Sequence, residues 1–138
     1  MSAKGKRATS AGGSFEVTIE ERFPATHALR FSGGDPEPLH GHDWCARVTV
    51  RADRLDGNGL AVDFQELRKA LKEVLAPLHG RALNEDVLEF GAGGMNPSAE
   101  NVALHIHRGL KARLGARLRV AAVSVEEEPG CWATFRPR

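Results

Sequence analysis

The chain has 138 residues, of which 41% are hydrophobic, and this length and composition predict one compact domain with an ordinary core. Its 19 Lys and Arg residues are balanced by 18 Asp and Glu residues, so there is no excess of positive charge to bind a nucleic-acid backbone. No apolar run is long enough to cross a bilayer or placed to act as a signal peptide. The two cysteines form no ligand pair and no disulfide framework. We therefore expect a cytoplasmic protein with no nucleic-acid or membrane partner.

The beginning of the chain divides into a tail and a strand. Residues 1–13 are rich in Gly, Ser, Ala and Lys and lack apolar periodicity, which predicts a disordered tail before a single domain over 14–138. From Phe15 onward, apolar and polar residues alternate, as is typical of a half-buried strand. If this strand stays regular through Pro24, the same alternation brings His27 to the apolar side.

The remaining pattern predicts two helices and three more strands in the order ββααββ, an α+β arrangement. Apolar residues recur at spacings of three and four after Asp63 and after Ser98, and both residue types are suitable N-caps. Between the helices, the glycine-rich loop from Glu85 to Met95 would suit a segment that moves over a ligand. The expected elements are a strand at 40–52, helices at 64–78 and 99–114, and strands at 118–127 and 131–136.

The clearest chemical signal is the spacing of His40 and His42. Residues two apart on a strand point to the same face, with side chains roughly 6–7 Å apart at their bases, so both imidazoles can bind one ion. Catalytic zinc sites use three protein ligands and leave a fourth position open, so a third ligand is needed. A hairpin could place His27 beside the pair. The other histidines lie on or beside the predicted helices: His79, His105 and His107.

Packing offers an alternative interpretation of this region. A His-x-His spacing also arises by chance, and His105 and His107 are interpreted as surface or packing residues of a helix. Trp44 shares the parity of the two strand histidines and could either wall a site or fill the core. Cys45 has the opposite parity, so we expect its thiol to point away from them.

Several motifs occur together, in order, over residues 14–136, and as a set they resemble the 6-pyruvoyl- and 6-carboxy-tetrahydropterin synthase family. They are FPATHAL, LHGHDW, GLAVDFQELRKAL, LN at 83–84, NPSAEN at 96–101 and VEEEPGCWATF. The resemblance implies the tunnelling fold, an antiparallel sheet with two helices on one face. It also implies a homohexamer built as a dimer of trimers, a small pterin-like substrate, and Zn²⁺ held by His27, His40 and His42.

The same resemblance assigns the pterin-anchoring carboxylate to Glu127. The pterin edge offers an amine and a neighbouring ring N–H, and one carboxylate can accept both hydrogen bonds. Parity supports this choice, since Glu126 would point to the opposite face and Glu128 belongs to a turn; a solvated acidic turn is the alternative. Ser98 and Ala99 match the segment that closes over the pterin in relatives.

Two departures from the family pattern concern proton transfer. Tetrahydropterin-forming members carry a cysteine shortly before the HGH motif, where residues 35–39 contain none, and an Asp-His pair where this chain has His79-Gly80. A subset of the family, associated with cleavage of dihydroneopterin to 6-hydroxymethyl-dihydropterin, has a glutamate that Glu37 matches. His79 could be a second acid or base, or a histidine favoured by a helix macrodipole, and Asp35 could substitute for Glu37.

Three functions therefore remain open from the sequence. The first is a zinc-dependent enzyme acting on 7,8-dihydroneopterin or its triphosphate, either as a tetrahydropterin synthase or as a side-chain lyase using Glu37. The second keeps the fold and metal but has a different substrate. The third is a non-catalytic protein that binds a pterin or a purine.

Overall fold

The computed structural model describes residues 12–138, so most of the predicted tail lies outside the described residues. A five-stranded sheet forms one layer of the structure. The strands are β1 (Phe15–His27), β2 (His40–Ala52), β3 (Arg81–Ala82), β4 (Arg119–Glu128) and β5 (Cys131–Phe135). The helices are α1 (Phe64–Leu75), α2 (Leu83–Asp86) and α3 (Ala99–Leu114), with single 3-10 turns η2 (Leu88–Phe90) and η3 (Gly115–Arg117).

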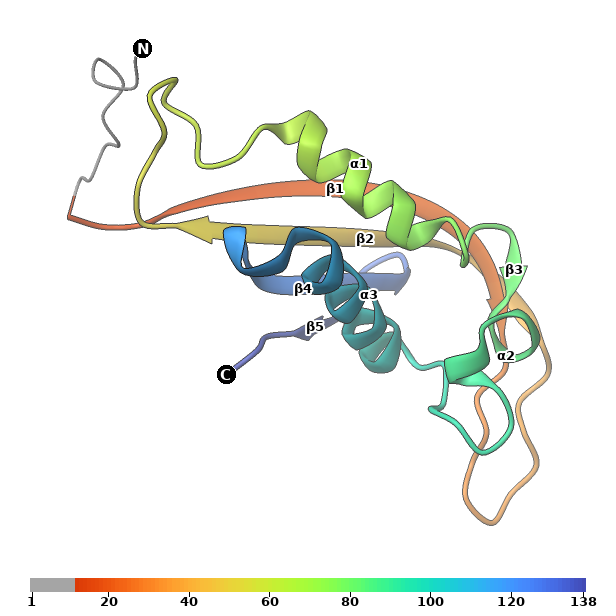
Figure 1. Cartoon of the computed structure of the whole chain (residues 1–138). Coiled ribbons are helices and arrows are strands. Elements are labelled where there is room, and N and C mark those ends of the chain that lie inside the picture. The colour runs from red at the N-terminus through yellow and green to blue at the C-terminus, as the bar shows by residue number, and fades with distance from the viewer. Residues whose placement is uncertain (1–11) are drawn as a thin grey trace.

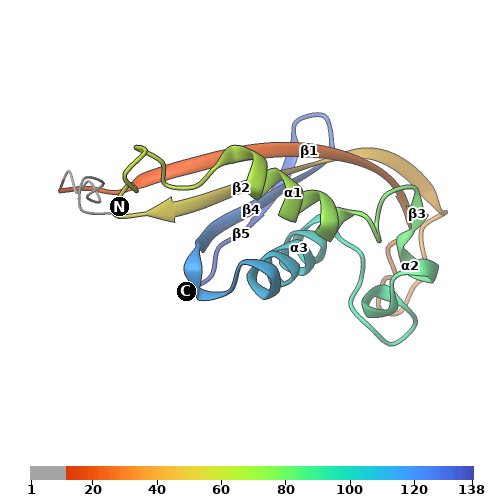
Figure 2. The ribbon, with the colours of Figure 1, turned by 45° about the horizontal axis from the view of Figure 1, so that its top comes forward.

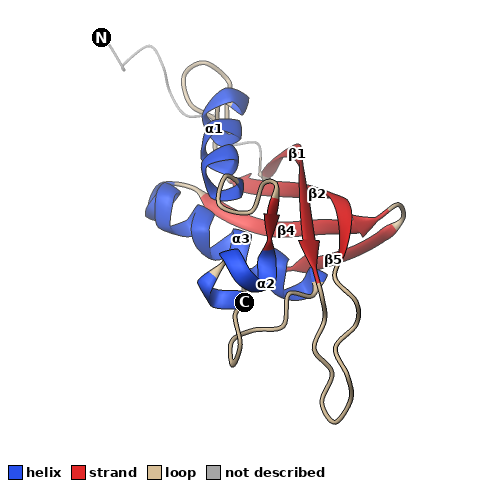
Figure 3. Cartoon of the chain, turned by 90° about the vertical axis from the view of Figure 1, so that its right-hand side faces the viewer, coloured by secondary structure: helices blue, strands red, loops and turns tan. Residues whose placement is uncertain are grey.

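The sheet has the strand order β3-β1-β2-β4-β5, and α1 and α3 lie on the same side of it (Figures 1 and 2). On the opposite face of β1 and β2 most side chains are polar or charged, among them Glu16, Glu20 and Arg47. The segment between β1 and β2 forms a long loop that projects from one end of the sheet (Figure 3). None of the helices in the described range is long and apolar enough to span a membrane.

The pairing of β1 with β2 sets the geometry of this end of the sheet. Each strand has 13 residues, and the antiparallel register runs without a shift from Phe15 opposite Ala52 to His27 opposite His40. The strand therefore stays regular through Pro24, as the sequence analysis required. His27 is fully buried on the face that packs against the helices.

The two long helices begin at the predicted caps. Asp63 Oδ1 accepts a hydrogen bond from the N–H of Gln65 at 2.8 Å, and Ser98 Oγ accepts one from Asn101 at 3.2 Å. The first helix ends at Leu75 rather than continuing to Leu78. Pro77 explains this difference, because it has no N–H to donate to the carbonyl four residues earlier, although Ala76 before it still has helical backbone angles.

The segment predicted as a long loop contains short regular elements. β3 has two residues and pairs in parallel with β1, so the sheet is mixed rather than wholly antiparallel. α2 and η2 follow it directly. The Arg30 guanidinium donates to the carbonyls of Phe90 and Met95 at 3.0 and 2.8 Å, which ties this segment to the chain just after β1. Elements of two to four residues are too short to show a hydrophobic period.

His107 fills the packing role expected for it. Its Nε2 donates to the carbonyl of Val120 at 3.3 Å, and its ring packs edge-on against Phe135 at 4.9 Å between centroids. Burial lowers the pKa of His107 below its ordinary value of 6.5, an effect to which the charge of Lys111 adds. The ring therefore stays neutral in the folded protein at a pH where the unfolded chain binds a proton.

We expect the free energy of unfolding to fall as the pH is lowered from about 7 to about 5, partly because of His107. In that range the unfolded chain takes up a proton that the folded ring excludes. His107→Gln should make the decrease shallower, as measured by urea unfolding at several pH values. The exposed His79 gives a matched control, and His79→Gln should keep the wild-type slope. A His107→Gln slope as steep as that of wild type would contradict this account.

Candidate metal centre

Three histidine side chains meet where the β1–β2 pairing ends. His27 lies opposite His40, and His42 lies two residues further along β2. One ring nitrogen from each of the three lies within 4.8 Å of the others, so the group could hold a metal ion. The structure thus brings together the three residues that the resemblance assigned as ligands, whereas His105 and His107 lie on α3.

Two of the three rings form hydrogen bonds through Nδ1, which leaves the lone pair of each Nε2 free. His27 Nδ1 lies 2.7 Å from the carbonyl of Pro97, and His40 Nδ1 lies 2.8 Å from that of Pro38. A carbonyl oxygen can only accept, so each Nδ1 carries the hydrogen and each Nε2 is free to bind a metal. Backbone carbonyls thereby hold two of the three rings in the tautomer that a metal needs.

Two of these Nε2 atoms have no other use in the structure. Those of His27 and His42 are buried, and no residue in the described range forms a hydrogen bond with either. Burial lowers the pKa of His27, although the hydrogen bond to Pro97 and the nearby charge of Glu127 oppose this effect. A buried, neutral imidazole with an unsatisfied lone pair is costly unless a cation binds it. Three imidazole nitrogens that lie this close together, two of them buried without a partner, fit zinc.

Glu127 lies beside the histidine cluster because the β4–β5 pairing is irregular at this residue. Pairing passes from Glu126 opposite Trp132 directly to Glu128 opposite Cys131, which leaves Glu127 unpaired in a bulge. Its two carboxylate oxygens lie 3.7 Å from the Nε2 atoms of His27 and His42. The parity argument for Glu127 thus agrees with the geometry.

Its neighbour Glu126 is directed elsewhere. The Glu126 carboxylate accepts a hydrogen bond from the N–H of Gly130 at 2.8 Å, within the β4–β5 turn. The two adjacent glutamates are therefore separated in role, one within the turn and one at the histidines.

Glu37 approaches the cluster from the loop between β1 and β2. Its Oε1 accepts a hydrogen bond from the N–H of Leu29 at 2.9 Å and lies 3.8 Å from His40 Nε2. The backbone N–H of Glu37 also donates to the carbonyl of Leu29, at 3.0 Å. The carboxylate oxygen that the backbone holds in place is thus also the one that lies near the His40 ring. Asp35, the alternative base, is exposed in the same loop.

His79 lies outside this cluster. It is exposed after the end of α1, where it borders a hollow together with Glu21, Arg22 and Lys72. No hydrogen bond or ion pair within residues 12–138 links it to the three histidines. The structure of one chain therefore does not bring His79 together with Glu37.

The residues predicted to contact a substrate line one small hollow. Glu127, Ser98 and Ala99 border a space of about 260 Å³, together with Cys131 and Trp132. Ser98 also caps α3, so the position of this wall is fixed by the start of the helix. Nothing in the sequence analysis placed Cys131 here, because its position next to Glu127 depends on the turn between β4 and β5.

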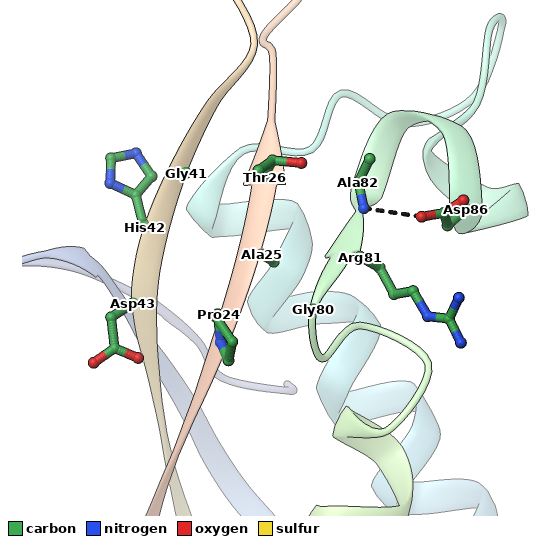
Figure 4. Close-up of a pocket in the computed structure, with 10 residues that line it drawn as sticks. All are labelled: Pro24, Ala25, Thr26, Gly41, His42, Asp43, Gly80, Arg81, Ala82 and Asp86. Atoms are coloured by element: carbon green, nitrogen blue, oxygen red, sulfur yellow. Dashed lines mark hydrogen bonds between the residues drawn. The ribbon is translucent and has the colours of Figure 1, made fainter.

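A larger hollow of about 660 Å³ lies between β1, β2 and β3 (Figure 4). It shares His42 with the cluster, but in Figure 4 the His42 ring extends to the side of β2 that is away from β3. Arg81 and Asp86 border it from the other side, where Asp86 accepts a hydrogen bond from the N–H of Ala82 at 2.9 Å. The hollow that contains Glu127 is therefore the better candidate for a ligand pocket.

Trp44 walls the histidine cluster from the core. It is fully buried, and its ring packs edge-on against those of His27 and His42, at 4.8 and 5.7 Å between centroids. Its Nε1 donates to the carbonyl of Ala25 at 3.2 Å. Trp44 therefore both fills the core and borders the histidine cluster, which combines the two interpretations of this residue. Cys45 lies on the opposite face of β2, as expected from its parity.

A family model described as 6-pyruvoyl tetrahydropterin synthase matches residues 16–138. The chain belongs to this family. The 6-carboxy-5,6,7,8-tetrahydropterin synthase of Bacillus subtilis (strain 168) is 29% identical over 134 residues, which cover 91% of this chain and 87% of that relative. The dihydroneopterin monophosphate aldolase of Pyrococcus furiosus is 30% identical over 111 residues, covering 80% of this chain and 88% of that relative.

Solved structures of the 6-pyruvoyl tetrahydropterin synthase family share the fold. The Caenorhabditis elegans 6-pyruvoyl tetrahydropterin synthase superposes with a TM-score of 0.80 at 23% identity, covering 91% of this chain and 96% of that chain. The predicted tunnelling fold is therefore confirmed, as is the broad assignment to tetrahydropterin synthase-like proteins that act on pterins.

Replacing His42 with Ala should remove the metal, because two imidazoles cannot replace the three ligands that a catalytic zinc site uses. We expect wild-type protein dialysed after zinc loading to retain one ion per chain in elemental analysis, and His42→Ala to retain none. His105 provides the control: its Nδ1 pairs with Glu89 at 2.6 Å, away from the cluster, so His105→Ala should keep its zinc. Stoichiometric zinc in both His40→Ala and His42→Ala would refute the assigned site.

Proposed function

We propose that this protein is a zinc-dependent enzyme that acts on the side chain of a 7,8-dihydroneopterin-type substrate. The observation that carries the proposal is the convergence of free Nε2 lone pairs with two carboxylates at one end of the sheet. Glu127 lies 3.7 Å from two of the histidine nitrogens, and Glu37 lies 3.8 Å from the third. Family membership supports a pterin as the substrate class.

Glu127 and the start of α3 would bind the pterin ring. The carboxylate borders the small hollow and the histidine cluster at once, so a ring that donates two hydrogen bonds to it would lie next to the metal. Ser98 and Ala99 form the adjoining wall. This arrangement would direct the substituent on the ring toward His40 and Glu37.

Glu37 would handle the proton of the side chain. Bound zinc would polarise the side-chain hydroxyl oxygens of the substrate and make their protons easier to remove. The Leu29 N–H holds one carboxylate oxygen of Glu37, which leaves the other to accept the proton. With the side chain of Glu37 27% exposed, a substrate can reach it.

Cleavage of the side chain is the outcome that the site favours. When the base removes the proton from the hydroxyl on the second side-chain carbon, the bond to the first carbon breaks and the pterin ring takes up the electron pair. Protonation of the first carbon then gives 6-hydroxymethyl-dihydropterin, and the other fragment leaves as glycolaldehyde or its phosphate. This reaction needs one base and one acid but no cysteine, and residues 35–39 contain none.

The descriptions of two similar proteins bear on this proposal, one on the cleavage reaction and one on the use of a catalytic glutamate. The Pyrococcus furiosus relative is a dihydroneopterin monophosphate aldolase. A 6-pyruvoyltetrahydropterin synthase structure from Plasmodium vivax, with a TM-score of 0.72 at 21% identity, is described as a catalytic residue mutant in which alanine replaces a glutamate. Formation of a tetrahydropterin remains the alternative reaction, and a homohexamer remains the expected assembly.

The proposal predicts that zinc-loaded protein converts 7,8-dihydroneopterin, its monophosphate or its triphosphate, with products identified by mass spectrometry. Glu37→Ala should lower kcat by about 10²–10⁴-fold while keeping one zinc per chain, because it removes the base but no ligand. The exposed Asp35 supplies the control, and Asp35→Ala should keep wild-type kcat.

The outcomes separate the remaining functions. No conversion of any of the three compounds by the zinc-loaded protein would refute the proposal and leave a different substrate or a binding role. Full activity of Glu37→Ala would transfer the role of the base to Asp35 or to His79.

Glu127→Gln should weaken pterin binding, because it exchanges one acceptor oxygen for an amide donor that faces the donors of the ring. Loss of a hydrogen bond to a charged group predicts an increase in Kd of about tenfold or more. Titration of a pterin into zinc-free protein by fluorescence would measure this without turnover. Glu126→Gln is the matched control, since that carboxylate serves the turn at Gly130. Equal affinities in the two variants would show that the anchor is misassigned.

A further inference from the structure

Residues 28–30, which follow His27, belong to no strand of the sheet. The Asn84 side chain pairs with Ala28 instead: Oδ1 accepts from the Ala28 N–H at 2.9 Å, and Nδ2 donates to the Ala28 carbonyl at 2.8 Å. The Asn96 side chain pairs with Arg30 in the same way: it accepts from the Arg30 N–H and donates to the Arg30 carbonyl, both at 2.8 Å. A primary amide offers a donor and an acceptor side by side, so each asparagine reproduces the paired bonds of a strand ladder.

The residue between these two faces the other way and holds the candidate base. Leu29 donates its N–H to the Glu37 carboxylate at 2.9 Å, and its carbonyl accepts from the Glu37 N–H at 3.0 Å. Every backbone N–H and carbonyl of residues 28–30 is thus paired, two residues by amides on one side and one by Glu37 on the other.

This short segment connects two functional groups of the site. His27 precedes it directly, and Glu37 reaches the site through it. Asn96 has a second link to the centre, because the next residue is Pro97, whose carbonyl accepts from His27 Nδ1 at 2.7 Å. The carbonyl of Asn96 is in turn held by Asn101 of α3 at 2.9 Å. The position of the His27 imidazole thus depends on side-chain amides that are not themselves metal ligands.

We propose that Asn84 and Asn96 are positioning residues of the metal centre. Their amides hold residues 28–30 in one conformation, so that the His27 imidazole and the Glu37 carboxylate meet at the same place. The part that concerns Glu37 rests on the proposed function. The part that concerns His27 needs only the metal, and the test is built on that part.

The near-isosteric changes Asn84→Asp and Asn96→Asp provide the test. Each replaces the amide donor with an oxygen that faces the carbonyl of Ala28 or Arg30, while the size of the side chain is kept. Loss of groups that orient a metal ligand lowers affinity by about 10–100-fold, so we expect Kd for Zn²⁺ to rise by that factor in competition with a chromophoric chelator. The visible absorption bands of bound Co²⁺ should also change in intensity, since they report ligand geometry.

A core variant separates positioning from general stability. Leu114 is buried at the far end of α3, and Leu114→Ala should lower the thermal unfolding midpoint without altering zinc affinity or the Co²⁺ bands. If either aspartate variant fails to fold, Asn84→Ala and Asn96→Ala remove the amide without adding repulsion and are expected to show the same loss of affinity.

Wild-type zinc affinity and Co²⁺ bands in the folded asparagine variants would overturn the inference, as would an equal loss of affinity in Leu114→Ala. A wild-type protein that converts no pterin would refute the proposed function while leaving this comparison of zinc affinities valid.

Discussion

The candidate metal centre depends on one constraint, the register in which β1 pairs with β2. His27 stands opposite His40 because the pairing is continuous over both strands. Burial enforces this register, since the same parity that carries the histidines also places Phe23 and Trp44 in the core with no exposed surface. A slip of one residue would turn all of these side chains to the polar face. The hydrophobic core therefore fixes which residues can share an ion.

The charges around the histidines are arranged for a cation. Imidazole nitrogens supply the lone pairs, and Glu37 and Glu127 bring two carboxylates close to them without hydrogen-bonding to them. Each carboxylate is placed by backbone structure, one by the N–H of Leu29 and one by a bulge in β4. A divalent ion would offset both charges, so the centre is electrostatically complete only with a metal or with protons in its place.

The sequence predicted the parts that rest on periodicity and could not predict those that rest on tertiary contact. Alternation and helical spacing identified both long strands, both long helices and the parity of Glu127. The two-residue β3 has no period to detect, and the end of α1 depended on Pro77. The hydrogen bonds from His40 and His27 to the carbonyls of Pro38 and Pro97 could not be predicted, because every residue has a carbonyl and the sequence does not show which one a ring will meet. Asn84 and Asn96 belonged to recognisable motifs, but their roles depend on a segment far away in the sequence.

The asparagine pairing also bears on how the edge of the sheet meets other chains. Exposed strand edges recruit further strands, and β1 is covered on its outer side by β3 only at Ala25 and Thr26. Beyond β1, the amides of Asn84 and Asn96 occupy the groups that an incoming strand would use. At this edge of the sheet, strand addition is thereby confined to the part of β1 that precedes Ala25, away from the histidines. Self-association through this edge and capture of a metal ion therefore use separate backbone groups and need not compete.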